Sequence, residues 1–203
     1  MQNSSPLPPG RLIVFEGIDG TGKSTQIQLL AKDLEAKGHE VVCSFEPTRG
    51  PWGMRVRNAA GANERLPVDE EIQCLLQDRR DHVKQLISPA LARGAWVLLD
   101  RYYLSMMAYQ GASGANVEQI RDMNEEFAPI PDIAIWLDQP LEESLQRMNT
   151  RGADRDAFER EEFLNKVASI YSQMEMPWIH RIEADLDIQE VHEQIRELIR
   201  EEL

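Results

Sequence analysis

The chain of 203 residues is long enough for one domain with a substantial core, and no change of composition marks a second domain. Its 22 Lys and Arg residues are outnumbered by 35 Asp and Glu, and the resulting net charge of -13 argues against a nucleic-acid polymer as partner. No apolar run reaches the ~20 residues that would cross a bilayer, so no membrane partner is expected.

Residues 1–10 lack the positively charged start and the apolar core of a secretory signal. They are predicted to form a disordered leader ahead of a single domain over residues 11–203. Cys43 and Cys74 lack metal-ligand spacing and are interpreted as core thiols of a protein in the reducing cytoplasm. The expected localisation is therefore cytoplasmic.

The first informative stretch is G-I-D-G-T-G-K-S, residues 17–24, between an apolar strand predicted over 11–16 and a helix predicted over 25–37. Its glycines allow successive backbone N–H groups to turn inward and form an anion site at a helix start. In such a loop Lys23 reaches the β- and γ-phosphates of a nucleotide, and the Ser24 hydroxyl ligates Mg²⁺. The alternative, a chance glycine-rich turn before a surface helix, does not explain this strand–loop–helix order. The residues predicted to hold ATP are Gly17, Ile18, Asp19, Gly20, Thr21, Gly22, Lys23, Ser24 and Thr25.

The next part of the chain is predicted to place a ligand loop after a second strand. A strand over 39–45 is followed by residues 46–53, whose prolines and glycines predict a loop. Loops at the carboxyl ends of strands are where open α/β sheets bind ligands. A short helix over 54–60 and a long helix over 67–92 come next, and the mixed charges at 78–82 favour a solvated helix face.

The third strand, predicted over 95–100, is apolar until it ends in Asp100. Enzymes with a phosphate-binding loop hold Mg²⁺ with an acid at this position, directly or through water. The alternative is an aspartate that only caps a turn. Ser24 and Asp100 are therefore the predicted metal-binding residues.

The remaining pattern continues the alternation of helices and strands to the C-terminus. Five strands that alternate with helices predict a doubly wound α/β fold with a five-stranded parallel sheet. The further elements are helices within 101–110 and over 116–127, a strand over 132–138, a helix from Pro140, a helix over 158–176, a strand over 178–182 and a helix over 187–203.

Four arginines are concentrated in the segment 147–160 of this acidic chain. Neighbouring acids would make it a salt-bridged surface loop. The functional alternative is a mobile lid whose guanidinium groups close over a transferring phosphoryl group. The arginines are Arg147, Arg151, Arg155 and Arg160.

Several blocks of the chain resemble those of the thymidylate (dTMP) kinases, a family of nucleoside monophosphate kinases. They read F-E-G-I-D-G-T-G-K-S-T, D-R-R-D-H-V, D-R-Y-Y-L-S-M-M-A-Y-Q-G and R-G-A-D-R-D-A-F-E, and the likeness runs from Leu12 to the C-terminus. The resemblance implies transfer of the γ-phosphoryl group of ATP to dTMP with Mg²⁺, giving ADP and dTDP for deoxynucleotide biosynthesis. It also implies a homodimer.

Position by position, the resemblance gives roles to individual residues. Asp19 lies near the sugar and phosphate of the acceptor, and Arg101 grips the acceptor phosphate beside Asp100. Arg79 reaches the thymine edge, and Tyr109 crowds the 2′ position. The full set implied for the acceptor is Asp19, Arg49, Leu75, Arg79, Arg101, Ser105, Met106, Tyr109 and Gln110.

The catalytic cation is expected to come from the lid, because Gly20 stands where some family members carry a loop arginine. Arg151 and Arg155 are the best candidates, with Arg147 behind them. The implied catalytic residues are Asp19, Lys23, Arg101, Arg151 and Arg155.

Three departures from the family pattern concern the acceptor. Leu75 replaces a phenylalanine that stacks on the base, and Met106 replaces a small polar residue or amide that hydrogen-bonds the pyrimidine. Phe45 replaces an arginine, so phosphate binding is expected to rely on Arg49, Arg55 or Arg57. Two alternatives stay open, a kinase for another deoxynucleoside monophosphate and a nucleotide-dependent switch that transfers nothing.

Overall fold

The computed structural model describes residues 9–61, 66–143 and 155–202. Within them, five strands form one parallel sheet in the order β2-β3-β1-β4-β5, which confirms the predicted fold class. Most of the predicted leader and residues 147–154 of the predicted lid lie outside these ranges. The strands are β1 (Arg11–Glu16), β2 (Val41–Phe45), β3 (Trp96–Asp100), β4 (Ile133–Asp138) and β5 (Ile179–Glu183).

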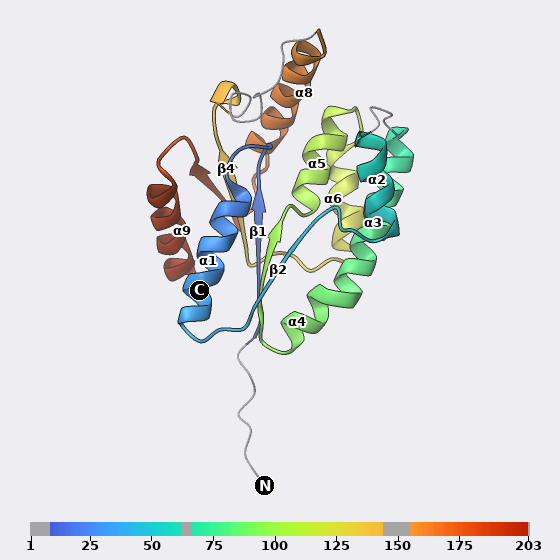
Figure 1. The fold of residues 1–203 in the computed structure, drawn as a ribbon. Helices are drawn as coiled ribbons and strands as arrows, with labels where there is room; N and C mark the ends of the chain where they lie inside the picture. Colours follow the sequence, from blue (N-terminus) through green and yellow to red (C-terminus); the bar gives the residue numbers. More distant parts are fainter. Residues whose placement is uncertain (1–8, 62–65, 144–154, 203) are drawn as a thin grey trace.

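Helices cover both faces of the sheet (Figure 1). Ile13 and Phe15 of β1 point into a core with α1 and α9, whereas Leu12 and Val14 point into the larger core on the opposite face. The helices are α1 (Lys23–Ala36), α2 (Pro51–Gly61), α3 (Val68–His82), α4 (Ser88–Ala92), α5 (Tyr103–Ala112), α6 (Val117–Glu125), α8 (Arg155–Ser172) and α9 (Ile188–Glu202), with a π-helical turn η1 (Val83–Ile87) between α3 and α4.

The sheet changes direction of winding at β1, which pairs with β3 on one side and β4 on the other. Phe15 and Phe45 both align with Asp100, so β1, β2 and β3 end at the same edge. Ligands of doubly wound sheets bind at the carboxyl ends of the strands at such a switch point. The loop at 17–24 begins there.

Two elements differ from their predictions because of proline. The predicted loop 46–53 is shorter, since α2 already begins at Pro51, a residue suited to the first turn of a helix. The predicted helix 67–92 contains η1, where the N–H of Ser88 bonds to the carbonyl of Val83. Pro89 has no N–H to continue the α-helical ladder, and the wider turn accommodates it.

The prediction that residues 78–82 form a solvated face of α3 is wrong for three of these five residues. Asp78, Arg79 and His82 are buried, whereas Asp81 is exposed. Asp78 accepts hydrogen bonds from the N–H and hydroxyl of Thr48, both at 2.6 Å, and from the N–H of Gly53 at 3.1 Å. The segment after β2 thus covers this face and pairs its charges.

We expect Asp78→Ala to lower the free energy of unfolding by about 3 kcal/mol, because the buried N–H of Gly53 and the partly buried donors of Thr48 lose their acceptor. Urea denaturation of the purified variant measures the loss. Asp81→Ala, on the exposed side of α3, is the matched control and is expected to change stability little. Equal stability of the two variants would contradict a structural role for Asp78.

The two cysteines are both free thiols but differ in their surroundings. Cys74 is buried, as predicted. Cys43 is exposed, so its prediction as a core thiol is wrong, and it lies on β2, an edge strand of the sheet. Across the described ranges, no helix has the length and apolar character needed to cross a membrane.

Candidate active site

The loop 17–24 wraps around the N-terminus of α1 and is tightly packed from behind. Gly17 has a φ of 131°, and a Cβ there would lie 2.5 Å from the carbonyl oxygen of Leu137. Gly22 has a φ of 91° and immediately precedes the helix. A side chain at either position would strain the turn, so both glycines are required by the shape that presents the helix N–H groups to an anion.

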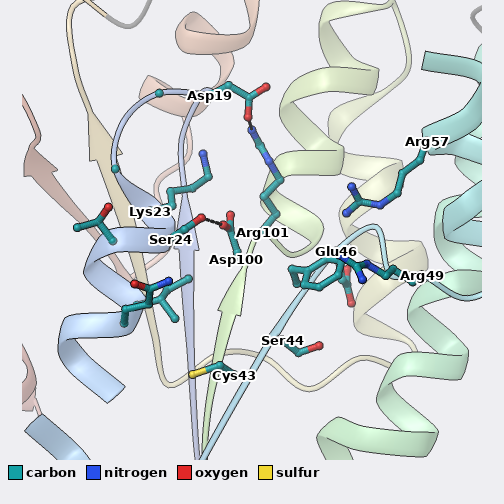
Figure 2. Close-up of a pocket in the computed structure, with 16 residues that line it drawn as sticks. Asp19, Lys23, Ser24, Cys43, Ser44, Glu46, Arg49, Arg57, Asp100 and Arg101 are labelled. Carbon is teal, nitrogen blue, oxygen red and sulfur yellow. Dashed lines mark hydrogen bonds and ion pairs between the residues drawn. The ribbon is translucent and has the colours of Figure 1, made fainter. Parts of the chain in front are cut away.

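Lys23 is folded back onto this loop. Its Nζ donates to the carbonyl oxygens of Gly17 at 3.1 Å and Ile18 at 2.8 Å (Figure 2 shows its direction). Burial, assisted by the nearby charge of Arg101, lowers the pKa of Lys23 to about 8, although Asp100 and other acids oppose the shift. An incoming polyphosphate would offer this amine negatively charged acceptors in place of the two carbonyl oxygens.

The two predicted metal-binding residues meet in the structure. The Ser24 hydroxyl donates to Oδ2 of Asp100 at 2.7 Å (dashed in Figure 2). Hydroxyl and carboxylate oxygens are hard ligands of the kind that Mg²⁺ prefers. Within the described residues, no cluster of three or more His, Cys, Asp or Glu side chains could hold a metal ion.

Arg101 directly follows β3, and its side chain hydrogen-bonds to three of the residues predicted to bind the acceptor. Its NH2 group donates to Oδ1 of Asp19 at 2.8 Å and to the Tyr109 hydroxyl at 3.3 Å. Its NH1 group donates to Oγ of Ser105 at 2.9 Å. The backbone φ of Arg101 is 72°, a strained value for a residue with a side chain, so surrounding contacts must hold it.

Two neighbouring cavities open at this edge of the sheet. The first, about 750 Å³, is lined by the loop 17–24, by Asp100 and by the segment after β2, including Arg49. The second, about 290 Å³, lies among α2, α3 and α5 and has every predicted acceptor residue except Arg49 in its wall. Asp19 and Arg101 line both cavities. One cavity thus offers a polyphosphate site, and the other offers a mainly apolar site with a few polar groups.

A family model described as Thymidylate kinase matches residues 15–195. The chain belongs to the thymidylate kinase family. Proteins named thymidylate kinase are similar along nearly the whole chain. The one from Akkermansia muciniphila is 58% identical over 190 residues, 94% of this chain and 91% of that protein. Those from Desulfotalea psychrophila and Xanthomonas oryzae are 46% and 45% identical, over 92% and 95% of this chain and 93% and 84% of their own lengths.

Membership of the thymidylate kinase family confirms the predicted class of enzyme, an ATP-dependent nucleoside monophosphate kinase. It also confirms the predicted function, phosphorylation of dTMP to dTDP by ATP in nucleotide biosynthesis. The alternative of a switch that transfers nothing is therefore not supported. The roles of individual residues remain predictions.

Arg79, predicted at the thymine edge, is held on all sides by protein. Its Nε and NH2 groups bond to Oε2 of Glu46 at 2.7 and 2.6 Å. Its NH1 group donates to Oδ1 of Asn124 and to Sδ of Met106, the latter at 3.4 Å. The thioether of Met106 thus serves as a weak acceptor for the arginine, and the guanidinium is fixed in the wall of the second cavity.

The buried partners of Arg79 were not identified from the sequence. Glu46 binds Nδ1 of His82 at 2.9 Å through its other carboxylate oxygen, and Nε2 of His82 lies 2.8 Å from Oγ of Ser44. Asn124 is fully buried in α6. The family block D-R-R-D-H-V contains both Arg79 and His82, so it pointed to this part of α3. No neighbouring residue in the sequence indicates that Asn124 contacts Arg79.

Two buried polar atoms in the second cavity lack partners among the described residues, the hydroxyl of Tyr102 and Oε1 of Gln110. Buried polar groups are nearly always hydrogen-bonded in native proteins. A ligand that donates a hydrogen bond to Gln110 would remove this deficit.

Two arginine side chains pack over the ring of Phe45 in the wall of the first cavity. The guanidinium carbons of Arg49 and Arg57 lie 5.8 and 5.1 Å from the centre of its ring. Arg55, the third alternative, instead pairs with Glu70 on the surface of α2 and α3. Of the three predicted replacements for the family arginine, Arg49 and Arg57 therefore lie in the cavity wall.

The predicted lid arginines are not placed by the structure. Arg147 and Arg151 lie outside the described residues, and Arg155 is described only as the first residue of α8.

Proposed function

We propose that phosphoryl transfer takes place where the two cavities meet, with ATP in the first and dTMP in the second. The observation that carries this proposal is the ion pair between Arg101 and Asp19, two residues that line both cavities. A nucleotide in each cavity would bring its phosphates toward this pair. The shared pair therefore supports transfer between nucleotides bound in the two cavities.

The chemistry asks mainly for positioning and for neutralisation of charge, because a phosphate acceptor is already a nucleophile. The N–H groups of the loop 17–24 and Lys23 would bind the donor phosphates, with the amine leaving the carbonyls of Gly17 and Ile18. Arg101 would hold the acceptor phosphate. Arg151 and Arg155 would supply the lid cations that exclude water and stabilise the transferring group, since Gly20 contributes none.

Mg²⁺ fits the oxygen pair of Ser24 and Asp100, and we assign both residues to it. When bound, the ion would neutralise charge on the β- and γ-phosphates. Ser24 lies at the start of α1, so its hydroxyl would stay close to phosphates bound at that helix terminus.

Gln110 supports dTMP as the acceptor. Its partnerless Oε1 can accept a hydrogen bond from N3–H of thymine, and the cavity wall around it is mainly apolar. Cytosine has an unprotonated N3 at the same place and would leave two acceptors facing each other. Leu75 lies in the same wall and would contact the base without stacking on it.

We expect Gln110→Leu to raise KM for dTMP about tenfold or more and to reduce the preference for dTMP over dCMP, because the base loses its specific acceptor. A panel of dTMP, dUMP and dCMP with ATP, read by ADP release, measures both effects. Gln77→Leu, on the exposed side of α3, is the control. A wild-type protein that prefers dCMP would contradict the assignment of the base, and a protein that releases ADP with no monophosphate would contradict the acceptor cavity.

A homodimer in the cytoplasm is the proposed working state. The exposed apolar side chains of Trp52 and Met54 on α2, exposed by 41% and 37%, would favour burial against another copy. The two free thiols suit a reducing compartment.

A further inference from the structure

A buried carboxylate lies directly behind the point where the two cavities meet. Glu16, the last residue of β1, is 0% exposed. Its Oε1 accepts from the N–H of Tyr102 at 2.8 Å, and its Oε2 accepts from the hydroxyls of Ser105 and, at 3.0 Å, Tyr171. Burial raises the pKa of Glu16, which shows that the site is costly for a carboxylate.

Glu16 fixes the backbone of Arg101. The N–H of Arg101 donates to the carbonyl of Phe15 at 2.9 Å, and the N–H of the next residue, Tyr102, donates to Glu16. Two successive residues of β1 therefore hold both peptide groups that flank Arg101. This explains how Arg101 keeps a φ of 72°, because strained backbones persist where surrounding contacts over-determine them.

Glu16 also fixes the side chain of Arg101 through one intermediary. The Arg101 NH1 group donates to Oγ of Ser105, and the Ser105 hydroxyl in turn donates to Glu16. The hydroxyl is thus oriented by the carboxylate, which leaves its lone pairs facing the guanidinium. The Glu16 carboxylate therefore holds Arg101 both through the backbone N–H of Tyr102 and through the Ser105 hydroxyl.

The same carboxylate is connected to the helix that follows the lid. Tyr171 lies in α8, which begins at Arg155, and its ring stacks on Trp136 of β4 at 5.9 Å and 13°. Its hydroxyl lies 3.0 Å from Glu16 and 2.9 Å from Oγ of Ser105. A shift of α8 would therefore change the hydrogen bonds that hold Arg101.

We propose that Glu16 is a positioning residue that holds Arg101 in its acceptor-binding conformation, and that Tyr171 links helix α8 to the same carboxylate. The proposal rests on the proposed function of Arg101 and goes beyond it, because neither Glu16 nor Tyr171 lines either of the two cavities. A carboxylate that served packing alone could be replaced by an amide of the same shape without kinetic effect.

Glu16→Gln is the main test, since the amide keeps the shape and an acceptor oxygen but removes the charge and one acceptor. We expect KM for dTMP to rise about tenfold and kcat to fall several-fold, with KM for ATP within about twofold of wild type. Tyr171→Phe, which keeps the stack on Trp136, is expected to give a smaller change of the same kind. The double variant should be no worse than Glu16→Gln, because both changes act through one network.

Tyr103→Phe is the matched control, because its hydroxyl bonds to Glu125 at 3.2 Å and faces neither cavity. If Glu16→Gln has wild-type KM and kcat for dTMP, the proposal is overturned. If that variant does not fold, Tyr171→Phe decides, and unchanged kinetics there overturn the link. Normal dTMP kinetics in Arg101→Ala would instead overturn the proposed role of Arg101, so the two failures are distinguishable.

Discussion

Arg101→Ala is expected to lower kcat/KM for dTMP by on the order of 10³-fold, with little change in the KM for ATP. The guanidinium has three acceptors in the free protein and would exchange some of them for the acceptor phosphate, a charge-assisted contact that alanine cannot make. Steady-state kinetics with varied dTMP and saturating ATP measure the loss. The fold should survive, because the side chain lies at a cavity wall.

Two further variants sharpen this prediction. Arg101→Lys keeps a charge but not the planar fork, so an intermediate loss is expected. Arg55→Ala removes an arginine that pairs with Glu70 at the surface, and it should behave as wild type. Normal turnover of Arg101→Ala would move the acceptor phosphate to Arg49 or Arg57, the other guanidinium groups at the first cavity.

The parts of the site that sequence could predict are those set by one strand end and the loop after it. The loop 17–24 follows an apolar strand, and Asp100 ends another. Because parallel strands end at a common edge, their proximity follows from the fold class alone. The hydrogen bond between Ser24 and Asp100 is the structural counterpart of that reasoning.

Glu16 is an acid at a strand end whose role the sequence did not predict. It also ends an apolar strand, one residue before the phosphate-binding loop, yet it is buried and faces Tyr102 and Ser105 instead of solvent. Whether an acid at a strand end faces a ligand or the core depends on what the following helix places over it. That information lies in α5 and α8, far away in the sequence.

The charged cluster at 78–82 illustrates the opposite error. Arg79 lies four residues after Leu75, on the buried side of α3, so helical spacing already placed it there. Charge pattern alone could not predict burial, because the partners come from elsewhere. Glu46 follows β2 and Asn124 belongs to α6, and only the folded chain brings them to the arginine.

The protonation state of Lys23 is expected to control the activity strongly, so that kcat/KM for ATP depends on pH. With a pKa of about 8 in the free protein, the amine is cationic below that pH and neutral above it. Only the cation can neutralise phosphate charge, so kcat/KM for ATP is expected to fall about tenfold per pH unit above about 8. Bound phosphates stabilise the cation, so the fall in kcat itself should begin at higher pH.

Lys23→Ala tests whether Lys23 causes this fall of kcat/KM at high pH. We expect kcat to fall by on the order of 10³-fold, and the remaining kcat/KM for ATP should be flat near pH 8, because the titrating amine is gone. Lys32 is an exposed lysine in the same helix, and Lys32→Ala should keep both the wild-type rate and the fall of kcat/KM at high pH. If the fall in kcat/KM near pH 8 persists in Lys23→Ala, the titration belongs to another group. Lys23 would then be a structural residue of the loop, where its amine bonds to the carbonyls of Gly17 and Ile18.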